Sequence, residues 1–237
     1  MSEFNMSYSM PNTGLNLEQV NAIFRKVYMY MAIGLIITAV TAYATASSAQ
    51  LVKIFYSSQA PMTIIAIVEV GLVLALGFMI HKLSVRAAVL LFALYSLLNG
   101  VLFSSVLLVY TQASVYKAFI STAGMFGAMS IYGLYTNKDL TSMGSFLRMG
   151  LWGIIIALIV NLFMGSSSLD LVISIFAVFI FMGLTAFDTW KIKQLASDID
   201  TADENLTGRV AVIGALSLYL DFVNMFLHLL RLFGKEK

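Results

Sequence analysis

The chain has 237 residues, of which 60% are hydrophobic and only 11% are charged, and its net charge is +2. Its mean hydropathy is +0.90. A soluble domain is about 45–50% apolar and about 25% charged, so the composition excludes a water-soluble globule and indicates an integral membrane protein. The small net charge and the two prolines also exclude nucleic-acid-binding, disordered and collagen-like classes. The absence of cysteine excludes disulfides and thiolate metal sites, and two histidines predict no His-rich metal centre.

A membrane-spanning helix needs about 20 mainly apolar residues. Seven stretches of the chain meet this requirement, and they are 28–49, 61–81, 86–109, 116–136, 146–165, 169–190 and 210–233. Their composition is typical of helices rather than of the short alternating strands of a barrel. We therefore predict a single seven-helix transmembrane domain over residues 25–237, preceded by a polar cytoplasmic N-terminal tail over residues 1–24. Residues 191–208 are polar enough to form a connector in water, and the alternative is that residues 191–197 extend the sixth helix.

The basic residues in the loops and at the ends of these stretches predict the orientation of the chain. One side collects nine of them, which are Arg25, Lys26, Lys82, Arg86, Lys138, Arg148, Lys191, Lys193 and Arg209. The loops of the other side carry only Lys53 and Lys117. Because cytoplasmic loops are rich in Lys and Arg, the N-terminus is predicted to be cytoplasmic. Seven crossings then place the basic C-terminal end outside, which the same rule disfavours, and a final segment that enters and returns on one side is the alternative.

Three acids within the predicted spans are candidates for a functional role, and they are Glu69, Asp188 and Asp221, because a charged group inside a membrane is costly and is rarely carried without a use. Asp221 is near the middle of the last stretch, ~18 Å of helix from either end. Asp188 is close to the cytoplasmic end of the sixth stretch, and an interfacial acid that faces Lys191 and Lys193 is the alternative there. Glu69 lies ~12 Å along the second stretch. For Glu69 the alternative is a structural ion pair, or a protonated acid that is hydrogen-bonded inside the bundle.

The last stretch carries a polar stripe. At 100° per residue, five polar side chains fall within an arc about 80° wide, and they are Ser217, Asp221, Asn224, His228 and Arg231. The opposite faces are apolar. Since lipid would leave such a stripe unsatisfied, it must face protein or water, and the last helix is predicted to be the buried, central one.

Two buried carboxylates that are brought together cannot both be ionised at low cost, so one holds a proton and the pair titrates as a unit. When both are ionised, they also suit Ca²⁺, a hard cation that prefers carboxylate oxygens. Protons and Ca²⁺ therefore compete for such a site. No motif of a zinc, serine or aspartyl intramembrane protease surrounds the three acids, so we expect that the protein is not an enzyme.

The C-terminal segment, SLYLDFVNMFLHLLRLFG over residues 217–234, resembles the signature of the transmembrane Bax inhibitor motif family. The sequence AFDT around Asp188 is similar to the other aspartate site of that family. GMFGAMS over residues 124–130, followed by KDL over residues 138–140, fits the bacterial branch. The likeness extends over all seven stretches, from about residue 20 onward.

The resemblance implies an all-α bundle in which six helices wrap around a central C-terminal helix. It also implies that Asp188 and Asp221 form a pH sensor that gates a slow Ca²⁺ leak, binding Ca²⁺ transiently and with no resident cofactor. The side chains expected to support the ion path or a latch are Glu69, Asn224, His228, Arg231 and Lys82. Relatives can carry a latch arginine about eleven residues after the acid of the second helix. In this chain that position is Ile80, with His81 and Lys82 beside it.

The partners expected from the resemblance are the lipid bilayer, Ca²⁺ and H⁺, with no nucleic acid, and the expected location is the bacterial cytoplasmic (inner) membrane. Eukaryotic relatives are associated with suppressing cell death, and a bacterial relative is linked to modulating a membrane-bound protease. The alternative function is therefore a regulator that binds partner membrane proteins and transports nothing. A proton-coupled carrier is disfavoured, because the chain shows no clear repeats or paired broken helices.

Overall fold

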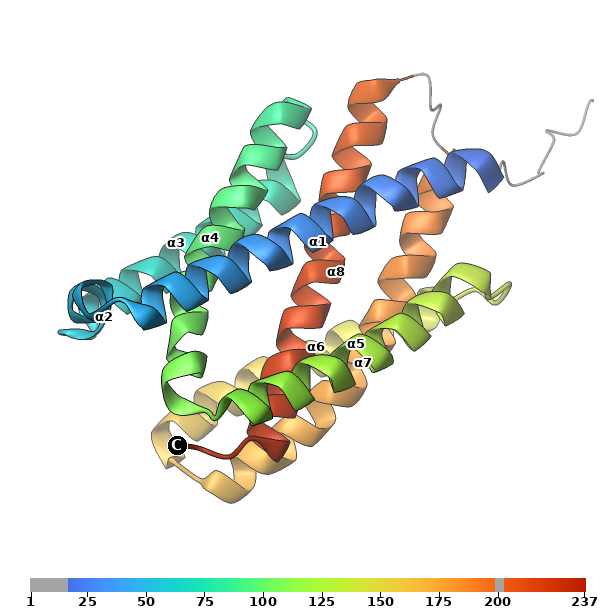
Figure 1. The fold of residues 1–237 in the computed structure, drawn as a ribbon. Coiled ribbons are helices and arrows are strands. Elements are labelled where there is room, and N and C mark those ends of the chain that lie inside the picture. The colour runs from blue at the N-terminus through green and yellow to red at the C-terminus, as the bar shows by residue number, and fades with distance from the viewer. Residues whose placement is uncertain (1–16, 199–202) are drawn as a thin grey trace, which may run out of the picture.

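The structure is a computed structural model that describes residues 17–198 and 203–237. The described chain is almost entirely helical, and its only β pairing is an isolated bridge near the C-terminus. In chain order the eight helices of the described residues are α1 (Leu17–Ser47), α2 (Ala49–Tyr56), α3 (Ala60–Met79), α4 (Val85–Val109), α5 (Gln112–Tyr135), α6 (Thr141–Met164), α7 (Ser167–Asp198) and α8 (Glu204–Phe233) (Figure 1).

Six of these helices are long and apolar enough to cross a membrane, namely α1, α3, α4, α6, α7 and α8. The predicted all-helical integral membrane protein is therefore confirmed. The fourth predicted stretch corresponds to α5, which has 24 residues. Helix α5 is rich in Ser, Gly and Tyr, and it is the one long helix of the described chain that falls short of the apolarity of the other six.

Two predicted boundaries differ from the structure. Helix α1 already begins at Leu17, inside the segment predicted as a polar tail. Helix α7 continues to Asp198, so the first part of the predicted connector 191–208 is helical. The reason for the longer α7 is burial, because Ile192 and Ala196 pack into the core cluster beneath α1 and α8.

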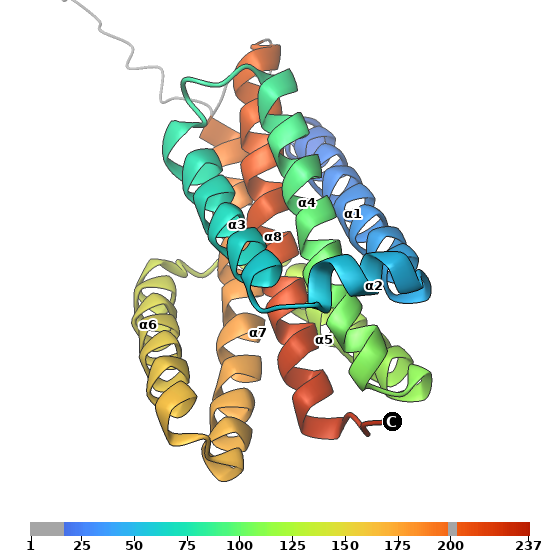
Figure 2. The same ribbon diagram turned by 90° about the vertical axis from the view of Figure 1, so that its left-hand side faces the viewer.

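Helix α2 was not predicted. It has eight residues, none of them buried, and its first turn is capped by Ser48, whose hydroxyl accepts the backbone N–H of Leu51 (3.4 Å). The hydroxyl of Tyr56 at its end lies 2.9 Å from that of Ser104 on α4. In Figure 2, α2 lies across the direction of α4.

Helix α8 is the most buried of the six membrane-spanning candidates, with 67% of an apolar stretch of 18 residues buried inside the protein. It packs against α1, α4, α5 and α7, whereas α3 packs on α4 and α6 packs on α7 (Figure 2). Three large side chains of α8 have no exposed surface, and they are Leu218, Tyr219 and Met225. Helix α8 thus contributes side chains to both hydrophobic core clusters of the described chain.

A hydroxyl network joins α8 to α1 and α4. The side chain of Thr38 lies 2.6 Å from the hydroxyl of Tyr219, and it also faces the carbonyl oxygens of Ser96 (2.9 Å) and Gly34 (3.0 Å). Because a threonine hydroxyl has one proton, which these carbonyls accept, Tyr219 donates to Thr38. Helices α1 and α4 approach closely because Gly100 has no side chain. A Cβ atom at this position would lie only 2.7 Å from the carbonyl oxygen of Thr38.

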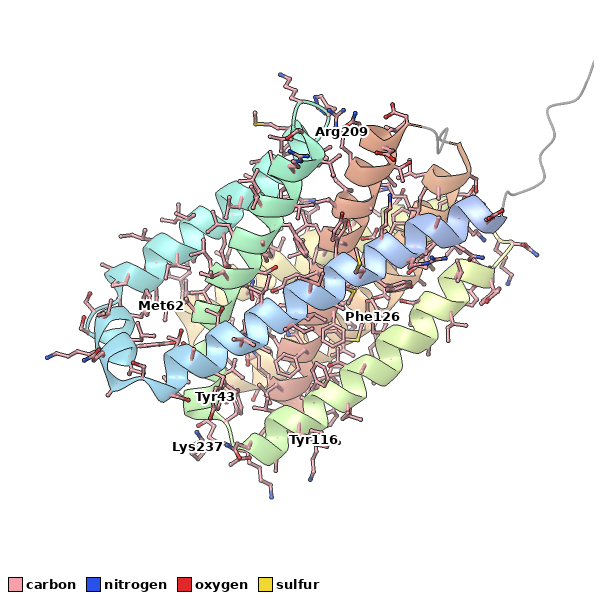
Figure 3. All side chains as sticks on the ribbon, turned by 45° about the horizontal axis from the view of Figure 1, so that its top comes forward. Tyr43, Met62, Tyr116, Phe126, Arg209 and Lys237 are labelled. Carbon is pink, nitrogen blue, oxygen red and sulfur yellow. The ribbon has the colours of Figure 1, made fainter. Side chains whose placement is uncertain are left out.

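The two ends of the bundle are tied by different contacts. Helix α8 is one continuous helix from Glu204 to Phe233, so the alternative of a final segment that enters and returns on one side does not describe it. After it, the N–H of Lys237 donates to the carbonyl of Val109 at the turn between α4 and α5 (2.9 Å). At the opposite end, Arg209 donates to the carbonyl of Leu83 between α3 and α4 (2.9 Å). Figure 3 shows Arg209 and Lys237 at these opposite ends.

Candidate functional site

Asp188 and Asp221 line one cavity of about 430 Å³ between α6, α7 and α8. Asp221 is only 4% exposed, and its Oδ2 atom is buried without a hydrogen-bond partner. Asp188 is half-buried. The two acids differed in predicted depth, and the longer α7 removes that difference, because it continues ten residues beyond Asp188. The structure therefore brings the two predicted acids together.

Helices α6 and α7 form a tight antiparallel hairpin beside this cavity. Gly165 ends α6 with φ 61°, a left-handed conformation that glycine adopts without strain, and α7 begins two residues later. Near the other end of the hairpin, a Cβ atom at Gly144 would collide with the ring of Phe187. The missing side chain lets α6 pack closely against the segment of α7 that carries Asp188.

A basic side chain, which the sequence places only among the charges that set the orientation, also lines this cavity. Arg148 lines the cavity from α6, its Nε donates to the carbonyl of Gly144 (3.2 Å), and its guanidinium lies 5.4 Å from the ring centroid of Phe187. Arg148 and Lys191 are the positive charges that act on Asp188. A signal was present in the sequence, since Arg148 falls inside the predicted span 146–165 and charges within spans are rarely idle.

Lys82, expected to contribute to a latch, is placed elsewhere. Lys82 and His81 are exposed in the turn between α3 and α4. Neither lines the cavity of the two aspartates, whose positive lining side chains are Arg148 and Lys191. The cations that face the acid pair therefore come from α6 and α7.

A second cavity, of about 650 Å³, lies between α3, α4 and α8 and contains Glu69. Glu69 is 8% exposed, and its Oε1 atom has no hydrogen-bond partner. On α4, the amide nitrogen of Asn99 donates to the hydroxyl of Tyr95 (3.1 Å), whereas Oδ1 of Asn99 is buried and unpartnered. The three predicted acids thus lie in two cavities, with Glu69 apart from the aspartate pair.

The predicted polar stripe of α8 faces these cavities. Its members that line the aspartate cavity are Ser217, Asp221, Asn224 and His228, and those that line the Glu69 cavity are Asn224 and Arg231. The two residues of the stripe nearest the C-terminus contact side chains of α7. His228 lies 3.2 Å from the hydroxyl of Ser174, and Arg231 forms an ion pair with Asp170 (3.7 Å) that is about 40% exposed.

Among residues 17–198 and 203–237, no three His, Asp or Glu side chains come together in a group that could hold a metal ion. Ca²⁺ takes 6–8 oxygen ligands. The aspartate cavity offers two carboxylates together with the side-chain oxygens of Ser217 and Asn224. A Ca²⁺ ion held by this donor set would need water to supply its remaining ligands.

A bundle of membrane-spanning helices, with acids lining cavities beside its most buried helix, defines a polytopic membrane protein with an intramembrane acid site. The family model described as "Inhibitor of apoptosis-promoting Bax1" matches residues 20–237, and the chain belongs to this Bax inhibitor family. The match begins where the resemblance of the sequence begins, and it confirms that resemblance.

Relatives match over nearly their whole length. The chain is 42% identical over 212 residues to the inner membrane protein YbhL of Escherichia coli strain K12, which covers 90% of this chain and 91% of the relative. It is 45% identical over 217 residues to a protein of Borreliella burgdorferi, covering 92% and 93%. A protein of Deinococcus radiodurans is 40% identical over 216 residues, covering 91% of each chain.

Proposed function

We propose that this protein is a pH-sensitive cation leak channel that passes Ca²⁺ and is gated by protonation of Asp188 and Asp221. The observation that carries the proposal is the shared cavity, because acids from α7 and α8 line one space within the bundle and a carboxylate oxygen of Asp221 lies there without a partner. Neither an enzymatic activity nor a resident cofactor is part of the proposal.

The charges around the cavity determine the sign of the pH dependence. When both acids are ionised, they attract a divalent cation and offset the positive charges of Arg148 and Lys191. On acidification, protons compete with Ca²⁺ for the same oxygens. Once the pair is protonated, Arg148 and Lys191 are no longer offset and repel an entering cation. The flux of Ca²⁺ is therefore expected to fall as the pH is lowered.

We further propose that α5 also crosses the membrane, so that seven helices span it with α8 at the centre and the N-terminus in the cytoplasm. The contacts of the basic residues support this arrangement. The ammonium group of Lys193 binds the C-terminal carbonyls of α5, and Arg209 binds the turn between α3 and α4, so predicted cytoplasmic loops and basic residues lie together. The inner-membrane relative of Escherichia coli supports a location in the bacterial cytoplasmic membrane.

The test is Ca²⁺ entry into dye-loaded liposomes that contain the purified protein, measured at about pH 6 and about pH 8. The wild type is expected to pass more Ca²⁺ at the higher pH. Asp221→Asn, which preserves the shape of the side chain, is expected to bring the ratio of the two rates close to one. The matched control is Asp170→Asn, since Asp170 is a half-exposed acid of α7 that lines neither cavity, and it should retain the ratio of the wild type.

Two results would count against the channel. A wild-type flux equal to that of protein-free liposomes at both pH values would exclude the leak. An unchanged pH ratio in Asp221→Asn, with the flux intact, would exclude gating by the acid pair.

The second candidate is a regulator that binds partner membrane proteins and transports nothing. The observation that favours it is the surface of α3 and α6, each of which buries only 11% of an apolar stretch of 18 residues and so leaves a broad apolar face. Such a protein would give no flux in lipid without a partner, so the liposome experiment separates the two candidates.

A further inference from the structure

The Glu69 cavity and the aspartate cavity meet at two residues of α8. Leu220 and Asn224 line both of them. The two residues are four apart in the helix and therefore lie on one face. In Figure 2, α3 and α4 flank the upper part of α8, and α6 and α7 lie beside its lower part; these helices complete the two cavities.

The side chains of Leu220 and Asn224 are more exposed than those of their neighbours on α8. Both are half-buried, whereas Tyr219, Asp221 and Val223 are buried. The amide nitrogen of Asn224 donates to the carbonyl oxygen of Leu220 (2.8 Å). Because this bond directs the nitrogen toward the helix backbone, the amide oxygen of Asn224 points away from it, where it can accept a hydrogen bond or bind a cation.

Unpartnered oxygen atoms lie on both sides of this pair. Oε1 of Glu69 and Oδ1 of Asn99 are buried without partners in the larger cavity, and Oδ2 of Asp221 is buried without a partner in the smaller one. Buried polar atoms are almost always satisfied by protein, water or an ion. Both cavities therefore contain groups suited to a hydrated cation.

The cavities overlap along α8 but are offset, since the aspartate cavity runs from Ser217 to His228 and the Glu69 cavity from Leu220 to Arg231. The larger one reaches Tyr110 and Arg231 near the C-terminal end of α8. The smaller one reaches Arg148 near the start of α6 and Lys191 in the last third of α7. A cation that passed from one cavity to the other would pass α8, and the only lining that the two cavities share is Leu220 and Asn224.

We propose that Leu220 and Asn224 form the constriction that a cation crosses between the Glu69 cavity and the aspartate cavity. The side chain of Leu220 is the apolar barrier, and the amide oxygen of Asn224 replaces a water ligand of the cation as it passes. This inference rests on the proposed channel function. It adds a determinant of the rate that is distinct from the acids that sense pH.

The first experiment measures Ca²⁺ entry into liposomes for variants at position 220. Leu220→Ala is expected to raise the flux several-fold while keeping the pH ratio of the wild type, because both aspartates are intact. Leu220→Phe, which enlarges the barrier, is expected to lower the flux at least as strongly. The matched control is Leu227→Ala, since Leu227 is a half-buried leucine of α8 that lines the larger cavity alone. Equal rates for Leu220→Ala and Leu227→Ala, or an unchanged rate for Leu220→Phe, would overturn the constriction.

The second experiment uses the absence of cysteine from the chain, which leaves any introduced thiol as the only one. Leu220→Cys is expected to react with a small cationic methanethiosulfonate added to either side of the membrane, and the reaction should reduce the flux. Leu216→Cys is the control, because Leu216 is 5% exposed and lines neither cavity. Reaction of Leu220→Cys from one side alone, or from neither, in a protein that still leaks Ca²⁺ would overturn the proposal. A wild type without flux would instead refute the channel itself.

Discussion

Replacing Lys193 with methionine is expected to destabilise the protein by loosening α7 from α5. Lys193 is 8% exposed, and its ammonium group donates to the carbonyl oxygens of Leu134 (3.0 Å) and Thr136 (2.7 Å). These acceptors lie at the C-terminal end of α5, where carbonyls lack helical partners and the helix dipole favours a cation. Methionine keeps the length of the side chain but removes both hydrogen bonds.

The magnitude follows from the two bonds. A hydrogen bond from a charged donor contributes about 1.5–3 kcal/mol. Because one ammonium group makes both bonds in Lys193, we expect a total of about 2–3 kcal/mol. For a chain of this length each kcal/mol corresponds to about 2–4 °C in melting temperature, so Lys193→Met should melt about 5–10 °C below the wild type.

The assay is thermal unfolding of the purified protein in one detergent, with Lys138→Met as the control. Lys138 is an exposed cation in the turn that follows α5, and exposed substitutions of this kind change stability by about 0.5 kcal/mol or less. If Lys193→Met and Lys138→Met melted within about 1 °C of each other, the ammonium–carbonyl contacts would contribute no net stability, and the reasoning would be refuted.

Two further substitutions test the packing around the site. Gly144→Ala introduces a Cβ atom that collides with the ring of Phe187, and overpacking of this kind costs about 1–3 kcal/mol. Gly153→Ala places its Cβ atom in open space, and it should hold or slightly raise the melting temperature because Ala favours a helix over Gly; equal melting temperatures for the two variants would contradict the close packing. Thr38→Val leaves the buried hydroxyl of Tyr219 unpartnered, at a cost of about 1–3 kcal/mol. In a double-mutant cycle, Tyr219→Phe should cost less in the Thr38→Val background than in the wild type, and strictly additive changes would argue against the hydrogen bond.

The membrane class, most of the helices and the polar stripe could all be predicted from the sequence, since each depends on local properties of the chain. The length of an apolar run predicts a span, and the angle between residues on a helix places Asp221 and Asn224 on one face. The stripe had to be internal because lipid offers no hydrogen bonds. The short helix α2 was missed, since its eight residues are too few to span a membrane and none of them is buried.

Contacts between helices far apart in the chain were decided by the tertiary structure. The seventh helix extends to Asp198 because its later turns pack against α1 and α8, and this extension places Asp188 in the cavity of Asp221. Arg148 faces the same acids only because Gly144 lets α6 approach α7. The sequence alone determined that acids are carried into the membrane on particular helix faces. Which of them meet, and which cation faces them, depends on how the helices pack, because packing alone fixes the relative depth and rotation of two helices.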